Sequence, residues 1–287
     1  MKQHTSQCAT SWGEPTMEEQ TMAAKQQTER TFPIRPRYVR LYTDPGVPLA
    51  ERNYEHAYLT WELPLKTTAL ICIDCWSWHF SEETLHRIET ISNERITPLL
   101  AACRAAGMPV IHMPANPVAE KHANFRRMRP ESEKAAAAWP SSPQWPPANF
   151  RSKSGPHAQF ARPAEPQRRD REEHRATTRD FHTTCMPTAG EPVLLDGEDL
   201  HRYCAQEGIL HLFFIGFNTN ACVMMRDYGL PAMVRRGYHG ILVRDCTTGM
   251  ETAETVADLT CTNGTIADIE QFLGYTVSSK ELISALG

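Results

Sequence analysis

Cys222 is the residue of this 287-residue chain whose type and position most directly suggest chemistry. It lies in the segment GFNTNACV, which follows the apolar run ILHLFFIG, so it comes at a turn from a predicted strand into a predicted helix. The positive end of the helix dipole and the unpaired backbone N–H groups there favour a thiolate, and the same groups can stabilise an oxyanion during acyl transfer. Free cysteines are also common as buried apolar residues, so the position alone leaves both interpretations open.

Asp74 is the second candidate, because it directly follows the apolar run TALICI. A carboxylate at the end of a strand beside the cysteine could accept the proton of the thiol. It could equally cap a helix or be a buried, hydrogen-bonded group. Ligands of open α/β sheets bind beyond the carboxyl ends of the strands. The same edge should hold other side chains that follow the first two strands: Trp76, His79, Phe80 and His112.

Segments typical of strands and helices alternate along the chain from residue 68. Short apolar runs that suit buried parallel strands lie at 68–74, 109–114, 191–195, 209–216, 239–245 and 275–278. Helical patterns lie at 92–107, 197–208, 221–237, 252–274 and 279–286. Pro98 is tolerated only in a first turn, so its helix should begin near Glu94. The alternation predicts one doubly wound, three-layer α/β domain with a six-stranded, mainly parallel sheet and helices on both faces.

The regions outside this alternation are expected to be accessory. Residues 1–32 are polar and lack periodicity, which predicts a disordered tail, and residues 33–287 should form the single domain. Prolines break the lead-in at 33–68 into short extended pieces that should wrap the domain. An insertion at about 115–180 is rich in proline and in charges of both signs, which is more typical of a solvated surface segment than of a basic patch for an acidic partner.

The composition disfavours several classes of function. The 30 Lys and Arg against 34 Asp and Glu argue against a nucleic-acid or anionic-membrane binder. No apolar run approaches the roughly 20 residues of a membrane helix, and the N-terminus lacks the apolar region of a secretory signal. Nine scattered cysteines fit a reducing compartment, so a cytoplasmic protein is expected. No glycine-rich phosphate loop follows a predicted strand, so a dinucleotide is disfavoured and no cofactor is expected.

From Thr68 to Gly287 the chain resembles the isochorismatase-like cysteine hydrolases. The resemblance rests on ALICID with a following aromatic residue, on RAAGMPVIHMP and, most specifically, on GILHLFFIGFNTNACVMMRDYGLPAMVRRGYHGILVRDCTTG. The last segment holds the signature Gly-x-x-Thr-x-x-Cys-Val as Gly216, Thr219, Cys222 and Val223. The resemblance implies a sheet in the order 3-2-1-4-5-6 and a homo-oligomer, either a dimer or a tetramer. It also implies hydrolysis of an amide, carbamoyl, imide or vinyl-ether bond in a small molecule.

In the amide-cleaving members of this family an Asp, a Lys and a Cys form the catalytic set, and Asp74 and Cys222 match two of them. The resemblance also implies a non-proline cis peptide, here Phe217–Asn218. Asp74 would take the thiol proton, a thioester would form on Cys222, and the amides of Ala221 and Cys222 would stabilise the oxyanion. The expected lining of the pocket is Trp76, His79, Phe80, His112, Asn218, Thr219 and Ala221.

The chain departs from the family at two places. The residues after Asp74 are more aromatic than usual, which implies a different substrate. The family's lysine after the third strand is absent, because VLL is followed by DGED. Lys153 in the insertion is the candidate substitute, and Arg151, His79 or His112 could supply a positive charge instead.

The missing lysine leaves two other functions open. One is hydrolysis of the isochorismate-cleaving type, in which a carboxylate protonates the substrate and no covalent intermediate forms. The other is a non-catalytic relative that binds a small molecule. A metal on Asp74, His79 and His112, as in a related nicotinamidase branch, is less favoured, because a histidine after a strand is more often hydrogen-bonded in a pocket.

Overall fold

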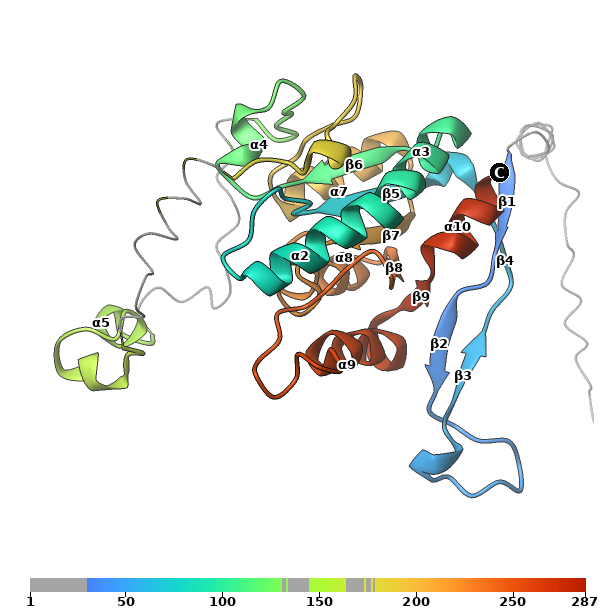
Figure 1. Cartoon of the computed structure of the whole chain (residues 1–287), viewed down its shortest axis with the longest axis horizontal. Helices are drawn as coiled ribbons and strands as arrows, with labels where there is room; N and C mark the ends of the chain where they lie inside the picture. Colours follow the sequence, from blue (N-terminus) through green and yellow to red (C-terminus); the bar gives the residue numbers. More distant parts are fainter. Residues whose placement is uncertain (1–29, 131–132, 134–144, 164–172, 174–176, 178) are drawn as a thin grey trace, which may run out of the picture.

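The described part of the chain begins before residue 33, the predicted start of the domain. The structure, a computed structural model, describes residues 30–130, 133, 145–163, 173, 177 and 179–287 (Figure 1). Most of the predicted disordered tail therefore lies outside the described residues. Its last two positions belong to strand β1 (Thr31–Ile34), in which Phe32 is buried. The boundary at residue 32 is therefore wrong, because Phe32 contributes to the core.

A seven-stranded sheet in the order β3-β2-β9-β8-β7-β5-β6 forms the centre of the molecule. Strands β5 to β9 are parallel to one another, whereas β2 and β3 are antiparallel to their neighbours. The predicted α/β class with a mainly parallel sheet is confirmed, and the predicted number of strands is corrected. The bounds are β2 (Arg37–Arg40), β3 (Glu55–Tyr58), β5 (Thr68–Ile73), β6 (Val110–Met113), β7 (His211–Gly216), β8 (His239–Val243) and β9 (Tyr275–Val277).

The strand expected at 191–195 is reduced to an isolated parallel bridge between Val193 and His112 in β6. Pro192 precedes the bridge and has no N–H to donate to a ladder. Directly beyond this segment, the side chain of Asp196 accepts from Glu198 N and Asp199 N and so caps the next helix. These two boundaries leave the segment too short for a full strand.

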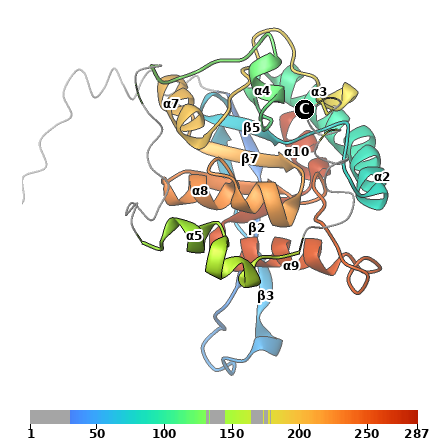
Figure 2. The same cartoon turned by 90° about the vertical axis from the view of Figure 1, so that its left-hand side faces the viewer.

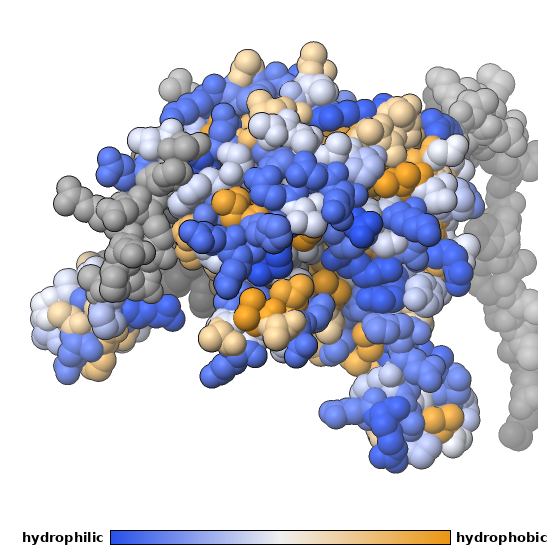
Figure 3. All heavy atoms as spheres, in the orientation of Figure 1, coloured by the Kyte–Doolittle hydropathy of each residue, from blue (hydrophilic) through white to orange (hydrophobic). Residues whose placement is uncertain are grey.

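The lead-in adds strands instead of wrapping the domain. Strand β1 pairs antiparallel with β4 (Trp61–Pro64), and β2 pairs with β3 as an arm that projects from the body in Figure 1. A short 3-10 helix, Glu51–Asn53, lies within the connection of this arm, and another, Leu65–Thr67, leads into β5. Large side chains are exposed along the connection: Tyr42, Val47 and Leu49. Figure 3 shows an apolar spot on the projecting arm.

Helices cover both faces of the sheet, as predicted (Figure 2). On one face, α2 (Glu82–Ile91), α3 (Thr97–Ala106) and α10 (Ser279–Leu286) pack on alternate residues of the strands. On the other face lie α7 (Gly197–Glu207), α8 (Leu230–Arg235) and α9 (Thr260–Asp268). Helix α9 continues directly into a π-helical turn, Ile269–Leu273. No helix among the described residues is long and apolar enough to cross a membrane.

The helix that contains Pro98 begins at Glu82, well before the predicted start near Glu94. Ser81 caps it by accepting from Thr84 N, and the helical path continues without a break into α3. A π-helical turn, Ser92–Ile96, directly precedes α3. The wider turn accommodates the missing N–H and the ring of Pro98, which a regular helix would not tolerate at that position.

The described residues of the predicted insertion include three short helical segments: α4 (Val118–Lys121), α5 (Ala148–Arg151) and a 3-10 segment, Gly155–Phe160. Residues 173 and 177 are helical as well. Figure 1 shows α5 set apart from the sheet and its covering helices. A further 3-10 turn, Thr183–Cys185, follows the insertion and contacts the helical turn Ser92–Ile96 and α3.

Candidate active site

Gly216 brings the ends of β5 and β7 together. It pairs with Ile73, has a φ of +114°, and a Cβ there would lie 1.7 Å from the carbonyl oxygen of Ile73. Only glycine combines this backbone conformation with so close an approach. Phe217 N then donates to Ile73 O at 3.0 Å, and the Phe217–Asn218 peptide is cis, as the resemblance implied. The chain that leaves β7 therefore starts beside the end of β5.

Asp74 is fully buried at that end of β5, with a φ of 49°. Its Oδ1 accepts from Ala115 N at 2.8 Å, and its Oδ2 accepts from Arg226 Nη2 at 3.3 Å. The thiol of Cys222 also hydrogen-bonds to this carboxylate. The structure therefore brings together the two residues for which the sequence predicted chemistry.

Cys222 lies in a π-helical turn, Thr219–Val223, and not in the regular helix expected at 221–237. Of the eight cysteines that the structure describes, Cys222 and Cys261 are partly exposed and the other six are buried. The backbone N–H of Asn218 also donates to the Cys222 sulfur. Cys222 thus combines partial exposure, a carboxylate partner and a main-chain donor.

The pKa of the Cys222 thiol is shifted upward, opposite to the direction expected from the helix dipole. Burial, together with the neighbouring charge of Asp74, raises the pKa of Cys222 to about 12. Burial also raises the pKa of Asp74, while Arg226 and the hydrogen bonds from Cys222 and Ala115 oppose that rise. A protonated thiol that donates to a carboxylate is suited to proton transfer during attack, and not to a preformed thiolate.

The cation beside Asp74 is Arg226, which was not among the predicted site residues. It lies one helical turn beyond the cysteine, with Arg226 N donating to Cys222 O at 3.2 Å, and its side chain returns to Asp74. The i to i+4 spacing from Cys222 in a predicted helix was the signal that could have identified it. The helical path then breaks before α8 at Gly229, where a Cβ would lie 2.5 Å from Val223 O.

Lys153 is not brought to the pair. Its ammonium lies 3.5 Å from the centroid of the Phe150 ring, within the segment around α5 that Figure 1 shows apart from the sheet. Arg151, at the end of the same short helix, lies in that segment as well. The substitution of the family's lysine by Lys153 is therefore corrected: the guanidinium at Asp74 comes from Arg226.

Three of the predicted lining residues, Asn218, His79 and Phe80, form a connected group beside Cys222 and Asp74. The Asn218 side chain hydrogen-bonds to His79 and also donates to Thr248 O at 3.4 Å. His79 Nδ1 accepts from Ser81 N, and burial lowers the pKa of this histidine. The ring of Phe80 stacks on His79 with centroids 4.3 Å apart and is itself 49% exposed. Phe80 therefore presents an apolar, half-exposed ring beside His79.

His112, Thr219 and Ala221 have other roles than the predicted ones. His112 is fully buried and donates from Nε2 to Glu191 Oε2 at 2.9 Å, which places its hydrogen bond away from Asp74. Thr219 is also fully buried, and its hydroxyl bonds to that of Thr247 at 2.7 Å. The Ala221 N–H already donates to Asn218 O at 3.2 Å, so it is not an open oxyanion donor.

Trp76 and Arg179 form the other side of the site. The guanidinium of Arg179 lies 3.7 Å from the centroid of the Trp76 ring, a cation–π geometry. Arg179 Nη2 donates to Asn116 O at 3.2 Å, and its charge also opposes the rise in the pKa of Asp74. The pattern of charges in the predicted insertion, which includes Arg179, had indicated a solvated surface segment.

A metal site at Asp74, His79 and His112 finds no support in this geometry. His112 is engaged with Glu191, and His79 with Ser81 N. Among the residues that the structure describes, no group of three or more His, Cys, Asp or Glu side chains could hold a metal ion.

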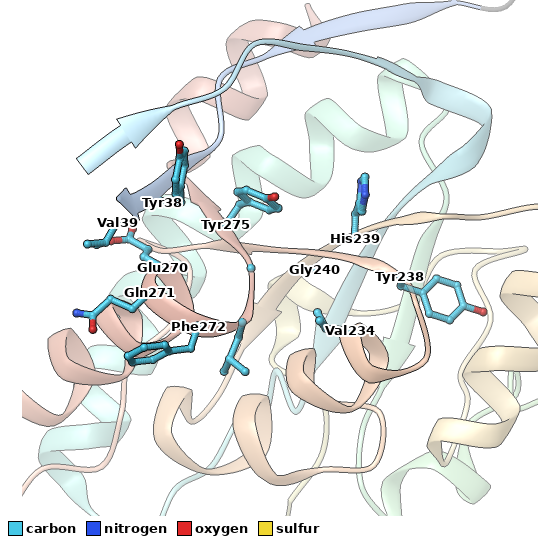
Figure 4. A pocket seen from close by; sticks show the side chains of 12 residues that line it. Tyr38, Val39, Val234, Tyr238, His239, Gly240, Glu270, Gln271, Phe272 and Tyr275 are labelled. Carbon is cyan, nitrogen blue, oxygen red and sulfur yellow. The ribbon is translucent and has the colours of Figure 1, made fainter. Parts of the chain in front are cut away.

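A cavity of about 370 Å³ lies near the start of β8, at the other end of the parallel strands from Asp74 and Cys222 (Figure 4). Its lining includes His239 and Gly240 at the start of β8, together with Tyr38 and Glu270. Asp74 and Cys222 lie at the carboxyl ends of the strands, so this cavity is separate from the site.

Comparisons with known proteins identify the family. The model of the isochorismatase domain matches residues 68–271. A cysteine hydrolase from Pseudomonas syringae pv. phaseolicola 1448A is 17% identical, with 79% of this chain and 95% of that chain covered and a TM-score of 0.50. A nicotinamidase from Bacillus subtilis (17% identity, 74% and 99% covered, TM-score 0.35) and an N-carbamoylsarcosine amidase from Thermoplasma acidophilum (13%, 74% and 96%, TM-score 0.37) are also similar. No curated protein matches. Because the family model covers more than half of the sequence, the chain belongs to the isochorismatase family of hydrolases.

Proposed function

We propose that the protein is a cysteine hydrolase that cleaves a C–N bond in a small amide or carbamoyl compound through a thioester on Cys222. The observation that carries this proposal is the hydrogen bond from the Cys222 thiol to the buried carboxylate of Asp74. A half-buried thiol beside a base, at the carboxyl end of a parallel sheet, is the arrangement that nucleophilic catalysis requires.

The reaction follows from the protonation states of the pair. As the sulfur attacks the carbonyl carbon, its proton passes to Asp74, and the C=O electrons move to the oxygen of a tetrahedral intermediate. The Cys222 N–H lies in the first turn of its helical segment, and we assign it as an oxyanion donor; the Asn218 N–H donates to the sulfur itself. Protonated Asp74 then returns the proton to the leaving nitrogen. Water, deprotonated by Asp74, cleaves the thioester and regenerates the thiol.

Arg226 takes the electrostatic role in which the family uses lysine. Asp74 is fully buried, and without a countercharge burial would favour its neutral form, which cannot accept a proton. The guanidinium at 3.3 Å stabilises the carboxylate and so keeps the base competent. The same charge stabilises the oxyanion, because it lies at the site where negative charge develops.

The test is ammonia release from a panel of primary amides, carbamoyl amines and ureido acids. Cys222→Ala should abolish turnover and leave the thermal unfolding midpoint nearly unchanged, and mass spectrometry of the wild type should capture an acyl adduct on this residue. Cys261→Ala is the matched control, because Cys261 is the other partly exposed cysteine of the described chain. Retention of activity by Cys222→Ala would overturn the thioester mechanism.

A second function follows if Asp74, which is buried at the end of β5 beside the partly exposed Cys222, acts as an acid and not as a base. A carboxyl group that holds its proton could protonate a vinyl ether directly, with no covalent intermediate. Hydrolysis of an enol ether by Cys222→Ala, together with its loss in Asp74→Ala, would identify this mechanism. Failure of wild-type protein on both panels would instead indicate a relative that binds a small molecule without turnover.

A further inference from the structure

His79 bonds to two segments of the site through the two nitrogens of its ring. Nδ1 accepts from Ser81 N at 3.0 Å, which leaves Nε2 for the side chain of Asn218, to which the ring is also hydrogen-bonded. A nitrogen that accepts carries no proton, so the proton of the ring lies on Nε2. The contact with Ser81 N requires the neutral ring, and burial shifts the pKa of His79 downward, in the same direction. His79 is therefore a donor toward Asn218 and not the positive charge of the site.

The Asn218 side chain is held from both ends of its amide. Nδ2 donates to Thr248 O at 3.4 Å, so Oδ1 is the atom that accepts from His79. Thr248 is fixed in turn, because Arg87 Nε donates to its hydroxyl at 3.0 Å. The side chains of His79 and Asn218 are both buried, so water does not compete for these hydrogen bonds. The amide consequently has one orientation that satisfies both of its neighbours.

Asn218 is also the residue whose backbone N–H donates to the Cys222 sulfur. The next residue is tied to the same carbonyl group, because Thr219 N donates to Thr248 O at 3.0 Å. With the Asn218 side chain fixed on one side and Thr219 N on the other, the backbone N–H between them is held in place. A donor aimed at the sulfur stabilises the negative charge that the sulfur gains as its proton leaves.

We propose that His79 is a positioning residue of the reaction: its Nε2–H holds the Asn218 side chain and thereby keeps the Asn218 N–H on the Cys222 sulfur. The inference rests on the proposed function, because this donor matters for catalysis only if the sulfur is the nucleophile. In this role His79 touches neither the substrate nor the sulfur and acts through Asn218. The tautomer of the ring, and not a charge on it, is the property that the site uses.

Iodoacetamide labelling of Cys222 tests the proposal, with Cys261 as the internal reference. His79→Phe keeps an aromatic ring against Phe80 but has no donor for Asn218, so labelling at pH 8 should slow by about 10-fold, as expected for one lost hydrogen bond to a charged group. On the amide panel kcat should fall by a similar factor, with little change in KM. His79→Gln carries an amide N–H that can reach the position of Nε2, and it should restore most of both rates. A purely structural role predicts the opposite, because loosening of the turn exposes the thiol and speeds its labelling.

A double variant shows whether His79 acts through Asn218. Asn218→Ala removes the side chain that His79 holds, so it should slow labelling by about as much, and His79→Phe should add nothing to its effect. Additive effects of the two changes contradict the proposal, as does unchanged or faster labelling in His79→Phe or no recovery in His79→Gln. If His79→Phe does not fold, Asn218→Ala decides in its place, and an unchanged labelling rate there overturns the proposal.

The matched control is His201→Phe. His201 is a histidine of α7 whose Nδ1 bonds to the Tyr238 hydroxyl at 2.8 Å, outside the site, so this change should leave the labelling rate of Cys222 as in the wild type. Failure of the proposed function gives a different pattern, because labelling does not require turnover. In that case Cys222→Ala and the wild type hydrolyse the panel equally, or neither hydrolyses it, while the labelling rates of the His79 and Asn218 variants still test the contact.

Discussion

The guanidinium of Arg226 lies 3.3 Å from the buried carboxylate of Asp74, one helical turn beyond the cysteine that donates to the same carboxylate. A single π-helical turn and the residues after it therefore supply both the nucleophile and the cation of the site. In the proposed mechanism, this guanidinium opposes the effect of burial on the pKa of Asp74 and so favours its ionised form. Arg226 also retains its charge at any accessible pH, which a lysine in a buried site need not do.

The first prediction concerns the pH dependence of activity in Arg226 variants. Asp74 acts as a base only when ionised, and burial raises its pKa, so wild-type kcat/KM should fall as the pH drops through a value above the usual one of aspartate. Arg226→Met removes the opposing charge and should move this acid limb to higher pH by about 1–3 units. Profiles of kcat/KM against pH for the wild type and both variants, Arg226→Met and Arg226→Lys, provide the measurement.

The lysine variant separates charge from shape. Arg226→Lys keeps a positive charge near the carboxylate and should restore the acid limb to near its wild-type position. An acid limb that stays in place in Arg226→Met means that this arginine does not control the ionisation of Asp74.

The second prediction is that Asp74→Asn makes Cys222 more reactive toward iodoacetamide while it abolishes turnover. Burial and the charge of Asp74 raise the thiol pKa to about 12, so removal of the negative charge should lower that pKa. Each unit of decrease gives about a tenfold larger thiolate fraction at pH 8. Peptide mass spectrometry measures the labelling rate at Cys222, with Cys261 as the internal reference. Slower labelling in the variant would falsify the view that Asp74 holds the resting thiol in its protonated form.

Local sequence patterns were sufficient to predict the class of fold, because the strands and helices that define the class are each determined by their own residues. The run TALICI is buried along its whole length as β5, and Gly107, with a φ of 80°, ends α3 as a C-cap glycine should. Non-local pairing was not accessible in the same way. The arm of β2 and β3 depends on contact with β9, which is more than two hundred residues away in the chain. No periodicity within the lead-in encodes that contact.

The candidate site was predictable where a single turn defines it and unpredictable where separate segments meet. Cys222 and Asp74 were identified because each follows a buried strand. His112 was placed in the pocket for the same reason, yet its ring turns to Glu191, which belongs to a segment distant in sequence. The alternating charges around Arg179 predicted solvated surface, whereas its contacts with Trp76 and Asn116, which form only in the folded chain, bring it near the site.

The third prediction concerns stability, and it arises from the buried carboxylate of Glu191. Arg104 donates to it from Nε at 2.7 Å and from Nη2 at 2.9 Å, and His112 donates at 2.9 Å. Burial alone would raise the pKa of Glu191, but these hydrogen bonds hold it well below its usual range. Glu191→Gln should therefore lower the free energy of unfolding by about 3–5 kcal/mol at pH 7, as expected when one partner of a buried ion pair is removed.

The pH dependence of that loss has a definite sign. Because the folded-state pKa is depressed, the carboxylate stabilises the protein above its unfolded-state pKa, and this contribution is lost as the pH falls toward the folded-state value. The difference between Glu191→Gln and the wild type should therefore shrink below about pH 4 in urea titrations. Glu120→Gln is the control, since its ion pair with Arg127 is 49% and 37% exposed and contributes about 0–1 kcal/mol. Equal losses in the two variants contradict the assignment.

The last prediction concerns Gly216, which lets β7 approach β5 and so places the cysteine turn beside Asp74. A Cβ would lie 1.7 Å from Ile73 O, and the φ of +114° is unfavourable for any L side chain, so Gly216→Ala must shift the backbone. The variant should lose more than about 3 kcal/mol of unfolding free energy, and any folded fraction should have lower kcat with little change in KM, because the pair is displaced. Gly264→Ala in α9 is the matched control: a Cβ meets nothing within 4 Å there, so the change should stabilise the helix by about 0.5–1 kcal/mol. Wild-type stability and kcat in Gly216→Ala would mean that the close approach of the two strands does not position the site.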